Sequence, residues 1–166
     1  PDRIVAGTYM LMTAAVGGDV RLLDVPLEQL GSVRKVLGQM GARQEAGEGM
    51  LRIQSKGRPR SISRIITRPY PGFPTDLQSP LLAALSLGEG CSVIEETIFE
   101  ARFKIVEELR RMGAQIQVEG QKALIQGVEE LRGTNLTARA LRGGAALVLA
   151  AAAARGTSRI YQYHYI

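Results

Sequence analysis

The sequence predicts an α/β (α+β) fold of repeated units, in which buried helices pack together and sheets lie outside them. An internal repeat is the main observation behind this prediction, because Met40-Gly41-Ala42 recurs 72 positions later as Met112-Gly113-Ala114. Ile53-Gln54 recurs at the same offset as Ile125-Gln126. A period of this length indicates a few supersecondary units around a shared core, not a solenoid of short repeats.

Each unit is predicted to run helix, strand, helix, strand, strand. The first helix of the first unit is followed by glycines, which can adopt a left-handed cap. Apolar residues from Leu30 to Met40 then recur at the three- and four-residue spacing of a second helix. The predicted elements of this unit are a helix at 9–16, a strand at 20–25, a helix after Pro26 that ends at Gly41, and strands at 50–54 and 62–67.

The second unit repeats this order and a third, partial unit begins it again. The predicted elements are a helix at 81–87, a strand at 92–95, a helix from Phe103 to Met112, strands at 115–118 and 123–126, a helix at 144–154 and a strand at 157–163. The first helix of each unit is apolar nearly all round, so we expect these three helices to lie side by side and to be buried. We expect one incomplete domain, with units at 1–70, 71–138 and 139–166.

The composition excludes several function classes. The 45% hydrophobic content supports a sizeable core. We expect no nucleic-acid partner, because the basic residues are interleaved with glutamates and only 5% of the residues are aromatic. The longest apolar run, 145–154, is shorter than the roughly 20 residues of a membrane span, so we expect no membrane partner. A single cysteine and the lack of a secretory signal favour a cytoplasmic location.

The segment Pro-Tyr-Pro-Gly-Phe-Pro at 69–74 is irregular, because its three prolines fix an extended connection. Two interpretations stay open from the residues alone. The segment is a stiff linker, with Thr75 or Asp76 as the N-cap of the next helix. Alternatively, it is a rigid arm that holds Asp76 at a site, since a general base must lie within hydrogen-bond reach of the proton that it accepts.

Four segments carry a resemblance to a known family. They are Pro-Asp-Arg-Ile, which opens 1–9, Pro-Tyr-Pro-Gly-Phe-Pro-Thr-Asp-Leu-Gln at 69–78, Glu-Glu-Thr-Ile-Phe-Glu-Ala-Arg-Phe at 95–103 and Leu-Arg-Gly-Gly-Ala-Ala-Leu-Val-Leu-Ala at 141–150. Together they resemble the UDP-N-acetylglucosamine 1-carboxyvinyltransferases (UDP-N-acetylglucosamine enolpyruvyl transferases) of the EPSP synthase superfamily. This resemblance implies a partial inside-out α/β barrel of βαβαββ-type units around buried parallel helices. The chain would be most of the domain that lacks the catalytic cysteine loop of the family.

The resemblance also implies a reaction. The family moves the enolpyruvyl group of phosphoenolpyruvate to the 3-hydroxyl of UDP-N-acetylglucosamine and releases phosphate, the first committed step of peptidoglycan synthesis. By resemblance, Asp76 and Arg142 are candidate catalytic residues, and Asp76, Ile98, Arg102 and Arg142 are candidate substrate-binding residues. Asp76 would lie at the sugar hydroxyl, Ile98 would contribute a backbone contact, and the arginines would grip phosphoenolpyruvate oxyanions. No metal and no cofactor are expected.

We expect Asp76, Arg102 and Arg142 to converge on one face, at the N-termini of the repeated helices, where backbone N–H groups also attract anions. Ala140 departs from the family pattern, which has an aspartate there that could orient Arg142. Cys91 is interpreted as structural, since it lies at a strand start and not in the family's cysteine loop. His164, the one histidine of the sequence, has no second metal ligand near it in the sequence.

Two other hypotheses about the function stay open. One is a non-catalytic paralogue or module that binds a sugar nucleotide or a protein partner, and the other is the related shikimate-pathway enolpyruvyl transferase, against which the Thr75-Asp76 segment argues. If the chain is a fragment, we expect it to be inactive without the missing catalytic domain. We also expect self-association, by exchange of the last predicted strand at 157–165.

Overall fold

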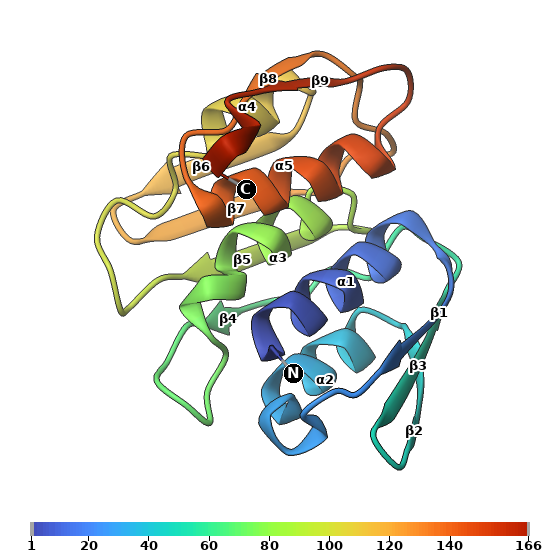
Figure 1. The fold of residues 1–166 in the computed structure, drawn as a ribbon. Helices are drawn as coiled ribbons and strands as arrows, with labels where there is room; N and C mark the ends of the chain where they lie inside the picture. Colours follow the sequence, from blue (N-terminus) through green and yellow to red (C-terminus); the bar gives the residue numbers. More distant parts are fainter. Residues whose placement is uncertain (1, 166) are drawn as a thin grey trace.

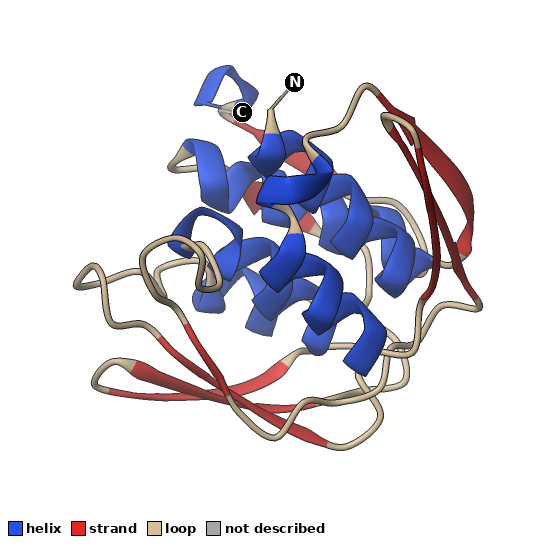
Figure 2. Cartoon of the chain, turned by 90° about the horizontal axis from the view of Figure 1, so that it is seen from below, coloured by secondary structure: helices blue, strands red, loops and turns tan. Residues whose placement is uncertain are grey.

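Three helices lie side by side at the centre of the computed structural model, which describes residues 2–165 (Figure 1). They are α1 (Arg3–Val16), α3 (Gln78–Leu85) and α5 (Leu141–Ala153), and each packs against the other two. Seen from below, strands lie outside the helices (Figure 2). The predicted side-by-side arrangement is therefore confirmed. Pro1 and Ile166, at which predicted units begin and end, lie outside the described residues.

The three helices differ in how far they are buried. All residues of α3 are buried. α1 and α5 are not buried all round, contrary to the prediction, because each leaves apolar side chains exposed along one side. Tyr9 of α1 is 51% exposed and Leu141 of α5 is 59% exposed. Apolar composition thus identified the central helices but could not show which of them is enclosed on every side.

The ends of the helices follow from local hydrogen bonds. α1 begins at Arg3, six residues before its predicted start, because Asp2 caps it: the Ile4 N–H donates to Asp2 Oδ1 at 2.7 Å. It ends at Val16, and the next residue, Gly17, has a positive φ of 88°, which glycine adopts without strain. The two amphipathic helices are α2 (Gly31–Gln39) and α4 (Val106–Arg111), and α4 is shorter than predicted.

The strands form three open sheets. The first has the order β1-β3-β2 and is antiparallel; the second has the order β4-β5-β7-β6, with β4 parallel to β5 and the other pairs antiparallel; the third is the parallel pair β8-β9. The strands are β1 (Gly18–Leu23), β2 (Arg43–Gly47), β3 (Met50–Ser55), β4 (Ile65–Ile66), β5 (Cys91–Glu95), β6 (Gln115–Glu119), β7 (Lys122–Gln126), β8 (Asn135–Thr137) and β9 (Arg159–Tyr161).

Two strands were not predicted, and two predicted strands were too long. The strand predicted at 62–67 is only β4, which has two residues. β2 is an edge strand whose residues are mostly exposed, so it lacks the apolar alternation that marks a half-buried strand. β8 is only three residues long. Of the last predicted strand, at 157–163, only β9 forms, because the chain continues as a 3-10 helix over Tyr163–Tyr165.

The βαβαββ order of the predicted fold class is present in the second sheet. Its elements follow one another as β4, α3, β5, α4, β6 and β7. β4 precedes the proline-rich segment in the chain and nevertheless pairs with β5, and β8 pairs with β9 across α5 in the same way. The first strand of the second sheet thus comes just before α3 in the chain, and the first strand of the third sheet comes just before α5.

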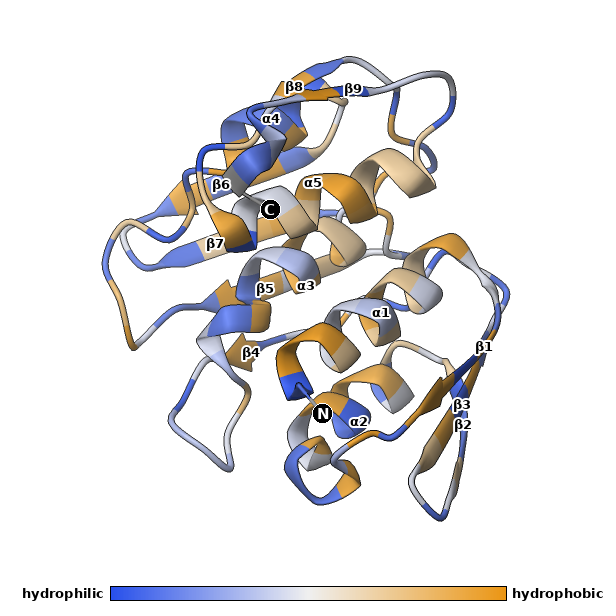
Figure 3. Cartoon of the chain, viewed as in Figure 1, coloured by the Kyte–Doolittle hydropathy of each residue, from blue (hydrophilic) through white to orange (hydrophobic). Residues whose placement is uncertain are grey.

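The core lies between the central helices and the inner faces of the sheets. Hydrophobic residues concentrate on α1, α3 and α5 (Figure 3). Leu51 and Ile53 of β3 and Ile94 of β5 are fully buried and belong to the same core cluster. Within residues 2–165, the helices are all too short or too polar to cross a bilayer.

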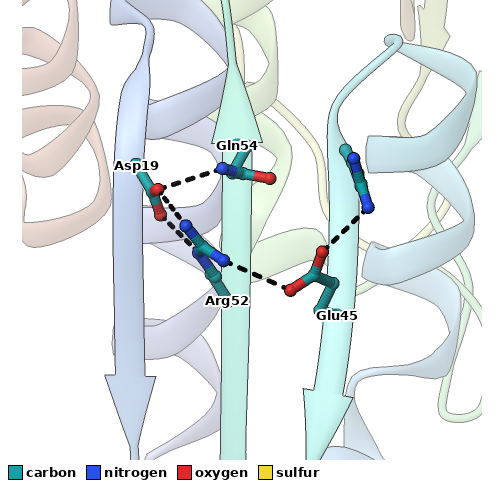
Figure 4. A network of polar contacts seen from close by, with 5 residues as sticks. Asp19, Glu45, Arg52 and Gln54 are labelled. Carbon is teal, nitrogen blue, oxygen red and sulfur yellow. Dashed lines mark hydrogen bonds and ion pairs between the residues drawn. The ribbon is translucent and has the colours of Figure 1, made fainter.

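A network of charged side chains covers the outer face of the first sheet (Figure 4). The Arg52 guanidinium donates to Asp19 through Nη2 at 2.6 Å and Nε at 2.8 Å, and Gln54 Nε2 donates to Asp19 at 3.0 Å. Arg52 Nη1 also lies 3.4 Å from Glu45 Oε2. The hydrogen bond from Arg52, helped by that from Gln54, lowers the pKa of Asp19 to about 2, although partial desolvation opposes the shift.

We predict that Asp19→Asn lowers the melting temperature of the chain at pH 7 and has far less effect at pH 2. The folded-state pKa of Asp19 lies below its ordinary value of 3.8, so the ionised carboxylate stabilises the fold above about pH 4, and this contribution is lost as the pH falls through about 2. Thermal unfolding of both proteins across this pH range measures the difference. Asp24→Asn, at an exposed loop position, is the control. A difference that persists unchanged at pH 2 would contradict the prediction.

Candidate active site

The N-terminal ends of the three central helices meet at a groove of about 420 Å³. Asp2, which caps α1, lines it together with Asp76, which precedes α3, and Arg142, which lies in the first turn of α5. The rest of the lining is mainly apolar and comes from α1 and α5, with Pro80 of α3. The groove thus combines an apolar floor with charged groups at one end, a combination common in ligand-binding sites.

The proline-rich segment forms a closed loop that carries Asp76 to the groove. The Arg68 N–H donates to the Phe73 carbonyl at 3.0 Å, and Phe73 is buried. A 3-10 helix over Thr75–Leu77 follows, and Leu77 packs so closely on α1 that a Cβ at Gly7 would overlap its side chain. Asp76 therefore lies on a segment that is fixed on both sides.

The interpretation of Thr75 or Asp76 as a helix cap is wrong. The N-cap position of α3 is Leu77, and no side chain caps this helix. The Thr75 hydroxyl instead donates to Glu96 Oε2 at 2.8 Å, and the Asp76 carboxylate accepts from Arg142. Both polar side chains therefore make long-range contacts, and the interpretation of the segment as a rigid arm that holds Asp76 at a site stays a prediction.

Asp76 and Arg142 form an ion pair between Oδ1 and Nε, although they lie 66 residues apart in the chain. Their side chains are 28% and 43% exposed, so solvent reaches both. The carboxylate can accept a proton or a hydrogen bond from a hydroxyl, and the guanidinium can hold an oxyanion. Ala140 carries no charge, and the charged partner of Arg142 is Asp76.

Ile98 and Arg102 lie on the loop that follows β5. The backbone N–H groups of Ile98 and Phe99 donate to Glu96 Oε1 at 2.8 Å and 3.2 Å. The Arg102 guanidinium lies over the Phe99 ring, 4.4 Å from its centroid. The structure thus brings Asp76 and Arg142 into contact, whereas Arg102 stacks on its own loop, and its convergence with the other two stays a prediction.

Sequence reasoning missed Glu96, which joins the Asp76 segment to the Ile98 loop. It is a carboxylate with only 1% of its surface exposed. A signal for it was available, because alternation along β5 places Ser92, Ile94 and Glu96 on the same, inward face, and all three are buried. An inward-facing glutamate requires partners, but the sequence did not indicate which ones.

The remaining candidates, Cys91 and His164, do not line the groove. The Cys91 thiol donates to Gln126 Oε1 at 2.7 Å, across the register of β5 and β7. His164 lies in the 3-10 helix over Tyr163–Tyr165. In the part of the chain that the structure describes, no three His, Cys, Asp or Glu residues are grouped so that they could hold a metal ion.

Comparison with known proteins identifies the family. The family model described as EPSP synthase (3-phosphoshikimate 1-carboxyvinyltransferase) matches residues 1–166. The chain belongs to the EPSP synthase family. Among solved structures, the enolpyruvyl transferase NikO from Streptomyces tendae has a TM-score of 0.88 and 24% identity, and the match covers 100% of this chain and 40% of that one. This likeness confirms the predicted fold class.

Within the EPSP synthase family, this chain is similar to proteins named UDP-N-acetylglucosamine 1-carboxyvinyltransferase. It is 48% identical over 166 residues to such a protein from Desulfofundulus thermocisternus, covering 100% of this chain and 68% of the relative. It is also 48% identical to UDP-N-acetylglucosamine 1-carboxyvinyltransferase 2 from Symbiobacterium thermophilum, of which it spans 39%. The resemblance read from the sequence is therefore confirmed, and this chain spans about two fifths of the length of the second relative.

Proposed function

We propose that this chain is part of an enolpyruvyl transferase that uses phosphoenolpyruvate and UDP-N-acetylglucosamine. The oxygen of the sugar 3-hydroxyl would bond to C2 of phosphoenolpyruvate while C3 gains a proton, and loss of phosphate and of a C3 proton would then restore the double bond. The names of the relatives that are 48% identical support the choice of substrates. The observation that carries the proposal is the Asp76–Arg142 ion pair at the end of the groove.

In this proposal, each candidate residue has a separate role. Asp76 accepts the proton of the sugar 3-hydroxyl, because it is a solvent-accessible carboxylate on a fixed segment. Arg142 and Arg102 bind the carboxylate and phosphate of phosphoenolpyruvate. The Ile98 backbone contacts the sugar nucleotide. Asp76 and Arg142 are the proposed catalytic residues, and all four are proposed substrate-binding residues.

The site is open on one side in this chain, so we propose that a second domain completes it. Enolpyruvyl transfer requires water to be excluded from the reacting groups, and a half-exposed ion pair does not meet that requirement. The 166-residue chain by itself would therefore be inactive. By the same resemblance, we propose a cytoplasmic location and a part in peptidoglycan synthesis, and thus in cell wall formation and cell division.

Phosphate release by the full-length protein that carries this chain tests the proposed function. We expect phosphate to form from phosphoenolpyruvate when UDP-N-acetylglucosamine is added and not when 3-phosphoshikimate is added. Turnover of 3-phosphoshikimate alone would favour the shikimate-pathway alternative. Binding of the sugar nucleotide without any turnover would favour the non-catalytic module.

For the 166-residue chain alone, we propose self-association through the apolar side of α1 and α5. Val5 is 53% exposed and Val148 is 37% exposed along the groove, and β9 is an edge strand. Sedimentation equilibrium should show a mass that rises with concentration, and Val148→Lys should reduce the rise. A monomer at every concentration would contradict this proposal.

A further inference from the structure

Glu96 is a buried carboxylate that the roles proposed above do not use. It lies directly after β5, with 1% of its surface exposed, and its own N–H donates to the Gln121 carbonyl at 2.9 Å. A carboxylate in the core is costly unless hydrogen bonds replace its water. Glu96 has three such bonds, and its two oxygens serve different segments of the chain.

The two oxygens connect the two halves of the candidate site. Oε2 accepts from the hydroxyl of Thr75, the residue directly before Asp76, at 2.8 Å. Oε1 accepts from the backbone N–H groups of Ile98 and Phe99, and Phe99 in turn stacks against Arg102. A single side chain therefore bridges the segment that carries Asp76 and the loop that carries Ile98 and Arg102.

We propose that Glu96 is a positioning residue that acts on Asp76 through the Thr75 hydroxyl. It holds the carboxylate of Asp76 at a fixed place relative to the backbone of Ile98, and thus relative to any ligand that the loop binds. This inference rests on the proposed function, because it assumes that Asp76 is the proton acceptor. A displacement of about 1 Å at such a group can lower turnover by about 100-fold.

The bond between Thr75 and Glu96 can be removed with almost no change in shape. In the full-length protein, Thr75→Val should lower kcat at least 10-fold and leave the KM for UDP-N-acetylglucosamine within a factor of about two, because only the Asp76 segment loses its anchor. Thr75→Ser keeps the hydroxyl and should restore most of kcat. Glu96→Ala should lower kcat and also raise this KM, since it releases the Ile98 loop as well.

Two further variants separate positioning from general stability. Thr13→Val removes another buried threonine hydroxyl, which donates to the Tyr9 carbonyl in α1, and should leave kcat unchanged. The double variant Thr75→Val with Glu96→Ala should have the kcat of Glu96→Ala alone, because the Thr75 hydroxyl then has no carboxylate to anchor it.

Amide hydrogen exchange in the 166-residue chain gives a readout that does not depend on activity. Exchange at Ile98 and Phe99 should become faster in Glu96→Ala and stay unchanged in Thr75→Val. A kcat for Thr75→Val within twofold of the parent, alongside a strongly impaired Asp76→Asn, would overturn the inference and leave the proposed function intact. Normal turnover of Asp76→Asn would instead overturn the role of Asp76 in the proposed function.

Discussion

Replacing Asp76 by asparagine in the full-length protein should lower kcat by about 100- to 10,000-fold, the usual contribution of a positioned general base. The KM for UDP-N-acetylglucosamine should change far less, because asparagine has nearly the same shape and can still form a hydrogen bond to a hydroxyl. What it cannot do is accept the proton as the 3-hydroxyl attacks. Steady-state kinetics at saturating concentrations of both substrates measures the effect.

Asp19→Asn is a matched control for this experiment. Asp19 is also an aspartate paired with an arginine, but it lies on the outer face of the first sheet, in the network around Arg52. Its substitution should leave kcat unchanged within a factor of about two, since surface positions act mainly on stability. Near-normal turnover of Asp76→Asn would eliminate Asp76 as the proton acceptor.

Replacing Gly127 by alanine should destabilise the chain by about 3 kcal/mol or prevent it from folding, because the new methyl group has no room. A Cβ at Gly127 would overlap the carbonyl oxygen of Gly88 and lie 2.6 Å from its carbonyl carbon. These are backbone atoms at the end of α3, which no change of rotamer can move. The segment is also fixed by the Gly127 N–H, which donates to the Gly90 carbonyl at 2.9 Å.

Urea denaturation of the 166-residue chain measures this loss, with Gly31→Ala as the control. Gly31 begins α2, and a Cβ there meets nothing within 4 Å. Alanine at that position should leave the free energy of unfolding unchanged or raise it by up to about 1 kcal/mol, because alanine favours a helix more than glycine does. Equal stability of the two variants would show that the Gly88–Gly127 contact can relax.

The internal repeat predicted the central part of the fold well, because equivalent positions in repeated units have equivalent places. Asp76 and Arg142 both lie at the start of a central helix, and this is why they meet although they are distant in the chain. The strand β3 was predicted from alternation of apolar and polar residues, and β7 was predicted from its place in the repeat; burial alternates along both. These patterns were sufficient for strands of five or six residues with one face in the core.

Contacts that depend on tertiary structure could not be predicted in this way. One of the two open interpretations had Thr75 or Asp76 capping α3, since such residues often cap helices, but the Thr75 hydroxyl donates to a buried acceptor on Glu96 instead. Nothing local marks these two residues as partners. The exposed edge strand β2 was missed for a related reason, because a strand with few buried residues carries little pattern.

The ion pair between Asp76 and Arg142 means that the groove presents a dipole at this point, and not a single unpaired charge. The pair joins Nε to Oδ1, and both side chains stay partly exposed, so an incoming molecule can still reach them. In the proposed function, an anion that binds Arg142 would weaken the pairing of Arg142 with Asp76. Binding of phosphoenolpyruvate and release of the Asp76 carboxylate toward the sugar hydroxyl would then be linked.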